Sequence, residues 1–127
     1  MSEKTGFQYV VLRCVPRVDR EEFVNVGVVL YSQMADFLEA RHHVDRERLS
    51  ALWPDLDLDA VCSALDVVQA VCRGDESVGA AGRTSLGTRF GFVSAPRSTV
   101  VQPSPIHGGV TTDPGRELAH LMGCLVS

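Results

Sequence analysis

The sequence predicts an α+β fold: an antiparallel sheet of four or five strands with two or three helices packed against it. Three observations predict this class. Segments rich in β-branched and aromatic residues dominate the first third of the chain. Apolar residues with a helical period fill the middle and the end. The strand-like segments 25–32 and 36–41 are joined by a short loop, which favours antiparallel pairing. With 127 residues, 45% of them hydrophobic and 22% charged, residues 1–127 are expected to form a single domain.

The first strand is predicted over residues 7–15 and stops at Pro16, which cannot donate to a strand ladder. Its nearly continuous apolarity places it in the middle of the sheet, where Arg13 requires a partner. A helical turn capped by Asp19 is expected next. Residues 25–41 then form a β-hairpin, in which Gly27 marks a bulge or the close approach of another backbone.

Two helices are predicted in the middle of the chain. Asp45 caps a short helix that ends at Pro54, and Asp57 caps a longer helix that Gly74 stops. The longer helix carries a 3.6-residue apolar stripe, which is expected to cover the sheet. The glycine-rich segment 74–88 is predicted to be a mobile surface connection.

The last third is predicted to hold two short strands, 90–94 and 99–102, on either side of a turn at Pro96. Residues 103–109 are expected to be extended, without helix potential. Asp113 followed by Pro114 begins a final helix, whose apolar face packs on the sheet.

Composition excludes several function classes. The first residues lack the basic start and apolar run of a secretory leader, so a cytoplasmic location is expected. The four cysteines lack close-pair spacing, so we expect them to be unpaired and mostly buried, with neither a disulfide framework nor a metal site. The net charge of −4 argues against a nucleic-acid surface. No cofactor is expected, because Lys4 is the only lysine and no phosphate-binding or dinucleotide motif is present.

Two parts of the sequence carry a family resemblance. The first runs from Tyr9-Val-Val-Leu-Arg13 through Pro16 to Asn25-Val-Gly-Val-Val-Leu30; the second runs from Arg89-Phe-Gly91 through Ala95-Pro-Arg97 to Pro105. With these segments the chain resembles the bacterial proteins grouped as domain of unknown function 3037. The resemblance implies no reaction, cofactor or catalytic residue. It does imply a partner, because members are often encoded beside a HipA-like protein kinase.

The strongest candidate site lies in the late segment 77–112, which contains no Asp or Glu. The candidate binding residues within it are Arg89, Arg97, Ser98, Thr99, Gln102, Ser104 and His107. Arginine binds phosphate or carboxylate through its planar fork, and the absence of carboxylates removes repulsion, so an anion-binding rim around Arg97 is one interpretation. The other, which we favour, is structural: the hydroxyls bond to their own turns and the arginines are solvated.

A second candidate cluster surrounds the first strand connection and comprises Arg13, Arg20, Glu22 and Asn25. An Arg–Glu pair there could orient the amide toward a ligand. The favoured alternative is a structural salt bridge and an Asn that caps a turn.

Two function classes follow. The first is a non-enzymatic binding or regulatory module that acts with a protein partner and binds an anionic ligand, with a homodimer as an open alternative. The second is a small hydrolase or transferase with His107 as acid/base, Arg97 as anion stabiliser and Glu22 orienting Arg13. No nucleophile-elbow pattern surrounds the serines, which favours the binding module.

Overall fold

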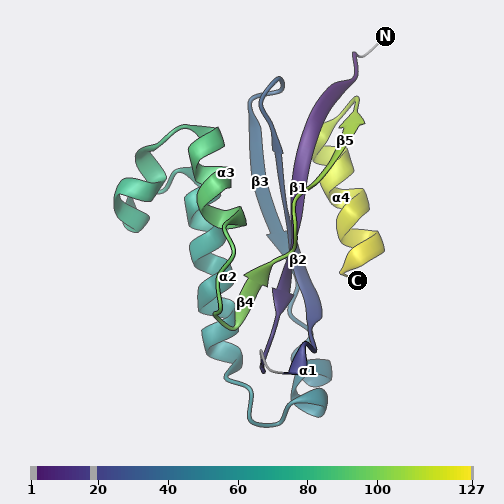
Figure 1. The fold of residues 1–127 in the computed structure, drawn as a ribbon, viewed down its shortest axis with the longest axis vertical. Helices are drawn as coiled ribbons and strands as arrows, with labels where there is room; N and C mark the ends of the chain where they lie inside the picture. Colours follow the sequence, from purple (N-terminus) through teal and green to yellow (C-terminus); the bar gives the residue numbers. More distant parts are fainter. Residues whose placement is uncertain (1–2, 18–19, 127) are drawn as a thin grey trace.

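The computed structural model describes residues 3–17 and 20–126. Its strands are β1 (Thr5–Cys14), β2 (Val24–Ser32), β3 (Phe37–His42), β4 (Val101–Pro103) and β5 (His107–Thr111). Its helices are α1 (Arg46–Leu52), α2 (Leu58–Arg73), the 3-10 segment η2 (Glu76–Arg83), α3 (Leu86–Ser94) and α4 (Pro114–Leu125). The strands form one antiparallel sheet with helices packed against it (Figure 1), which confirms the predicted α+β class.

The sheet has β1 in its middle, as the apolarity of residues 7–15 predicted. The strand order is β3-β2-β1, and both β4 and β5 pair with the remaining side of β1. β5 pairs with residues 5–9 of β1, and β4 pairs with residues 12–14. The two short strands therefore act as one interrupted strand along β1.

Ser104 bridges the interruption between β4 and β5. It is buried between two prolines, which lack the N–H groups that a continuous strand would use. Its backbone N–H donates to the carbonyl of Val11 at 2.8 Å, and its hydroxyl accepts the N–H of Val11 at 2.8 Å. The hydroxyl also donates to the carbonyl of Pro105 at 2.9 Å. The hydroxyl of Ser104 thus takes the place of a backbone carbonyl as the acceptor for the N–H of Val11.

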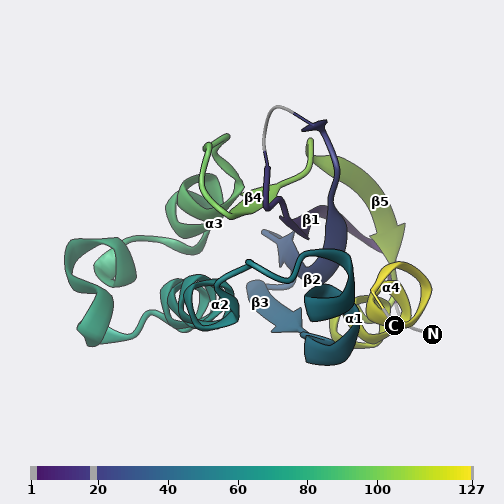
Figure 2. The same cartoon turned by 90° about the horizontal axis from the view of Figure 1, so that it is seen from below.

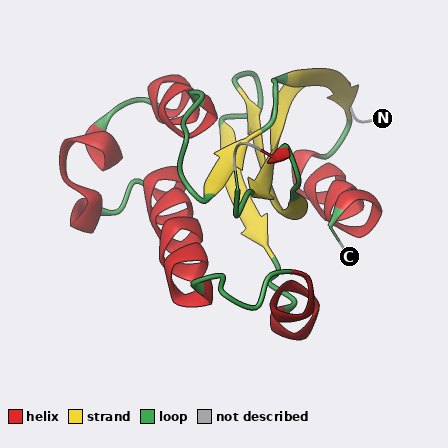
Figure 3. Cartoon of the chain, turned by 60° about the horizontal axis from the view of Figure 1, so that its bottom comes forward, coloured by secondary structure: helices red, strands yellow, loops and turns green. Residues whose placement is uncertain are grey.

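Helices cover the two faces of the sheet unequally. Viewed from below, α2 and α3 lie on one side of the strands and α4 lies on the other (Figure 2). The larger core, under α2 and α3, takes alternate residues of β1 such as Val10 and Leu12 and joins them to Leu65 of α2. The smaller core, under α4, joins Phe7 of β1 to Leu118. The helices drawn in red in Figure 3 thus flank the strands.

Caps predicted from the sequence set the helix boundaries. The carboxylates of Asp45, Asp57 and Asp113 each accept the N–H three residues later, at the starts of α1, α2 and α4. Gly74 ends α2 in the left-handed conformation, with φ 71°. The turn predicted at Asp19 begins outside the described residues.

Gly27 fulfils the prediction made for it. The register between β1 and β2 shifts between Leu12 and Arg13, opposite a bulge in β2. A Cβ on Gly27 would lie 2.8 Å from the carbonyl oxygen of Arg41 on β3. Only glycine permits this approach. The register shift, for its part, places Asn25 of β2 opposite Arg13.

Three segments differ from prediction. Residues 90–94 are part of helix α3, which brings the number of α-helices in the described chain to four instead of two or three. The prediction of a strand there is wrong: Phe90 and Val93, three residues apart on one helix face, pack together into the larger core. Residues 74–88 are not a plain connection either, because they form η2 and the start of α3. Conversely, β5 forms in a segment for which only extended chain was expected.

Candidate functional site

Arg13 is the centre of the candidate site. It stands opposite Asn25 on β2 and opposite Gln102 on β4. Residues directly opposite one another in antiparallel strands project to the same face. The sheet therefore places side by side three predicted site residues that come from two separate parts of the sequence.

Phe23, just before β2, completes this group. The guanidinium carbon of Arg13 lies 4.2 Å from the centre of the Phe23 ring, a cation–π contact. The phenyl ring nevertheless remains 45% exposed. We call Arg13, Phe23, Asn25 and Gln102 the Arg13 cluster.

The Nε of Arg13 lacks a hydrogen-bond partner. It is buried, and no acceptor bonds to it among residues 3–17 and 20–126. A buried donor left unpaired costs free energy, and most such groups in proteins are paired. By contrast, the amides of the cluster are used: Asn25 donates to the carbonyl of Leu125 at 3.0 Å, and Gln102 donates to that of Thr99 at 3.0 Å.

Two adjoining hollows lie beside the cluster, between β2, α1 and the end of α4. One, of about 260 Å³, is lined by Val24, Asn25, Val26, His43, Asp45, Arg48, Leu49 and Val126. The other, of about 170 Å³, is lined by Phe23, Val24, Asn25, Arg48, Leu125 and Val126. The guanidinium of Arg48 has no ion-pair partner within the described part of the chain. The region therefore offers cationic donors beside an exposed ring.

Arg89 lies elsewhere and serves the fold. Its Nη1 donates to the last carbonyls of α2, at 2.8 Å to Cys72 and 3.3 Å to Val71. Its Nε donates to the carbonyl of Thr84 at 3.2 Å. A cation at this position satisfies carbonyls that have no partner within the helix and complements the helix dipole.

Arg97 has a similar arrangement at the end of α3. Its Nη2 donates to the carbonyl of Phe92 and its Nε to that of Ala95, and the guanidinium lies 5.4 Å from the centre of the Phe92 ring. Thr99 donates its hydroxyl to the carbonyl of Val101 at 2.7 Å, and Ser98 is exposed. These contacts match the structural interpretation of the acid-free segment, and anion binding at Arg97 stays a prediction.

The residues named for catalysis make separate contacts. His107, on β5, stacks on Tyr9 with ring centres 5.1 Å apart. Glu22 forms an exposed ion pair with Arg20, at 3.0 Å. A salt bridge is therefore present in this cluster, as expected, but it is exposed and joins Arg20 to Glu22, while Arg13 contacts Phe23.

The thiols differ in their surroundings. All four are free; Cys14 and Cys72 are buried, Cys62 is half-buried and Cys124 is exposed, so the expectation that most are buried holds for only half of them. Burial raises the pKa of Cys14 to about 11 and that of Cys72 to about 12. Neither buried thiol is ionised at neutral pH, which removes both as nucleophiles. The described residues contain no group of three or more His, Cys, Asp or Glu side chains that could hold a metal ion.

Two members of the site were missed by sequence reasoning. In the sequence, Phe23 lies next to the cluster that was predicted around the first strand connection. Its exposure beside Arg13 depends on the path of the chain before β2. Arg48 belongs to α1 and reaches the site only because α1 packs beside the start of β2. The sequence of α1, with Arg46 two residues before Arg48, does not indicate which of its arginines reaches the site.

Comparison with known proteins agrees with the resemblance noted in the sequence. The family DUF3037, described as a protein of unknown function, matches residues 9–126. Neither a curated protein nor a solved structure matches the chain. Within the described residues, the helices are all too short or too polar to cross a membrane.

Proposed function

The chain belongs to the DUF3037 family, whose description names no activity, and from its own surface we propose that it is a non-enzymatic binding module that acts with a protein partner. The observation that carries this proposal is the Arg13 cluster. It combines a half-exposed phenyl ring, a stacked guanidinium and a donor without a partner in the described chain. Aromatic and arginine side chains supply most binding energy at protein interfaces.

The charges around the cluster support a partner surface that is acidic. Arg13 and Arg48 are cationic, and Asp45, the acidic side chain that lines the larger hollow, accepts the backbone N–H of Arg48 at 3.1 Å as the cap of α1. A carboxylate of the partner would pair with the guanidinium groups, and an apolar side chain would cover Phe23. We therefore propose an acidic and apolar segment as the bound element.

The partner implied by the family resemblance is a HipA-like kinase. A module that binds such a kinase needs an exposed anchor side chain and charged groups that can pair with the kinase surface. The Arg13 cluster has an exposed phenyl ring and a guanidinium group for these two roles. The separate contacts of His107 and Glu22 support a binding role over the hydrolase or transferase alternative.

The test is to express the chain with the HipA-like kinase encoded in the same genome, purify the complex and measure its dissociation constant by calorimetry. The decisive variants are Phe23→Ser and Arg48→Glu. We expect each to weaken binding about tenfold or more, the effect of losing about 1.4 kcal/mol at an interface anchor.

Matched controls are available in the chain. Phe92→Ser removes a ring that is 47% exposed and also contacts an arginine, and Arg83→Glu reverses an exposed arginine on η2. Both should bind like the wild type. Equal losses for Phe23→Ser and Phe92→Ser, or no kinase binding by the wild type, would refute the proposal.

A further inference from the structure

The outer edge of β5 is an open sheet edge. β5 pairs with β1 on one side, and in the described chain no strand pairs with its other side (Figure 1). Four of its five residues are exposed, and Val110 is 63% exposed. Residues 105–112 carry no formal charge. Such an edge presents unpaired backbone groups to another strand.

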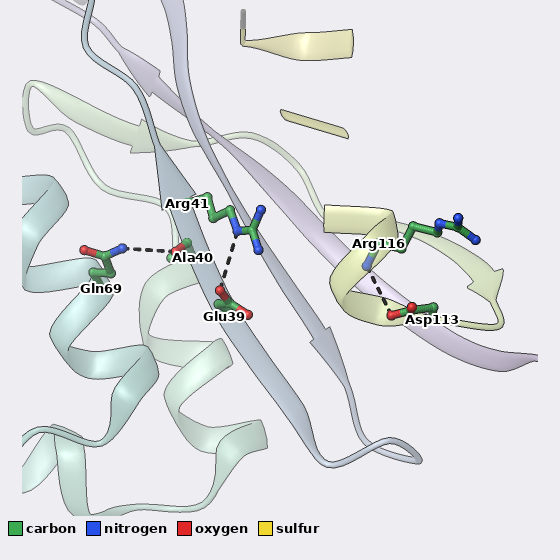
Figure 4. A network of polar contacts seen from close by, with 6 residues as sticks. All are labelled: Glu39, Ala40, Arg41, Gln69, Asp113 and Arg116. Atoms are coloured by element: carbon green, nitrogen blue, oxygen red, sulfur yellow. Dashed lines mark hydrogen bonds and ion pairs between the residues drawn. The ribbon is translucent and has the colours of Figure 1, made fainter. Parts of the chain in front are cut away.

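The opposite edge, β3, is protected. Gln69 of α2 donates its side-chain amide to the carbonyl of Ala40 at 3.3 Å, so a backbone acceptor of this edge is already occupied (Figure 4). Glu39 and Arg41, which flank Ala40, form an ion pair at 3.5 Å. Charged side chains and covered backbone groups are the means by which proteins block edge pairing. β5 has neither.

The free backbone groups of β5 can be identified from the ladder. The N–H and C=O of Val11 both bond to Ser104, so the odd-numbered residues of β1 point their backbone groups toward β5. Their partners His107, Gly109 and Thr111 point back toward β1. Gly108 and Val110 therefore direct their N–H and C=O groups outward.

This edge is complementary to itself. Consider two copies of β5 paired antiparallel, with the two-fold axis at Gly109. The outward N–H and C=O of Gly108 then face those of Val110 in the second copy, and the outward groups of Val110 face those of Gly108 in the second copy. The absent side chain of Gly108 leaves room for Val110 of the second copy. His107 stands opposite Thr111, so no like charges meet across the two-fold axis.

We propose that the chain forms a two-fold dimer in which β5 of one copy pairs with β5 of another and the two sheets become continuous. The surface is distinct from the Arg13 cluster, and the inference does not depend on the proposed kinase partner. Because a single strand pair buries little area, the dimer dissociates on dilution.

The first experiment measures mass in solution by sedimentation or light scattering from about 5 to about 500 µM chain, since association follows mass action. The mass should rise toward twice the 13.8 kDa of one chain. Val110→Lys places a charge at the two-fold contact and should raise the dissociation constant at least tenfold. Val67→Lys, at a valine that is 50% exposed on α2, is the matched control and should leave it unchanged.

The second experiment needs no variant. Hydrogen exchange of the wild type should slow at the amides of Gly108 and Val110 as concentration rises, while the amides of His107 and Gly109, bonded to β1, are protected at every concentration. If the chain is monomeric over the whole concentration range, the proposal is overturned. An extended segment of another protein is then the remaining candidate to pair with this edge. A dimer whose Gly108 and Val110 amides exchange freely, or which tolerates Val110→Lys, overturns it as well.

Discussion

Replacing Arg89 separates a structural role from a ligand-binding role. Its guanidinium bonds to two carbonyls at the end of α2, and a hydrogen bond to a charged group is worth about 1.5–3 kcal/mol. Because Arg89 is half-buried, its bonds are only partly screened. We expect Arg89→Met, which keeps the aliphatic stem, to lower the free energy of unfolding by about 1.5–3 kcal/mol in total.

Urea denaturation followed by circular dichroism measures this change directly. The control is Arg83→Met, because Arg83 is exposed and its side chain forms no hydrogen bond or ion pair within the described residues; it should change the free energy of unfolding by less than about 0.5 kcal/mol. If the two variants are equally stable, Arg89 does not hold the end of α2, and the assignment of a purely structural role is wrong.

Four further predictions concern the core and the thiols. Leu65→Ala, at a fully buried position of α2, should lower the free energy of unfolding by about 2–5 kcal/mol in chemical denaturation. Ser104→Ala should lower it by about 1–3 kcal/mol, because the N–H of Val11 loses its acceptor; Ser104→Thr, which keeps the hydroxyl, should recover part of the loss. In thiol titration, Cys124 should react in the folded protein, and Cys14 and Cys72 only after unfolding. The raised pKa values of Cys14 and Cys72 make the stability depend on pH. The contribution of these two thiols to the free energy of unfolding is fully present below about pH 9 and is lost as the pH rises toward 11–12. A pH-independent stability between pH 8 and 11 would contradict it.

Much of the fold could be predicted because the signals are local. Caps at Asp57 and Gly74 and the apolar stripe between them define α2 within one stretch of chain. The segment wrongly predicted as a strand, residues 90–94, has an apolar run too short to distinguish a strand from a helix by its period. The cap of α3 was present, since Ser85 accepts the N–H of Thr88, but the decisive evidence is burial of Phe90 against distant strands.

β5 escaped prediction for a related reason. Gly108 and Gly109 give the segment low strand propensity. The ring of Phe7 lies over Gly109, within 2.7 Å of where a Cβ would stand, so an aromatic side chain from β1 fills the space that glycine leaves. This compensation comes from a residue about a hundred positions earlier and cannot be inferred from the local sequence.

The residues of the candidate site could also be predicted only in part from the local sequence. Sequence reasoning named Arg13, Asn25 and Gln102 but assigned them to two groups, because their meeting depends on strand order and on the bulge opposite Arg13. It also named Arg89 and Arg97 for an anion, although the helix ends they contact are formed partly by residues predicted as a loop or strand. The segregation of charge along the sequence is real, and both arginines donate to backbone carbonyls of the chain itself, while anion binding at Arg97 stays a prediction.

The most direct test of the central claim is hydrogen exchange of the chain with and without the HipA-like kinase. If the kinase binds at the Arg13 cluster, amides at the start of β2 around Asn25 and in α1 around Arg48 should become protected, and those of α3 should not change. Protection confined to residues 107–111 of β5, or no protection at saturating kinase, would contradict the assignment of the Arg13 cluster as the partner-binding surface.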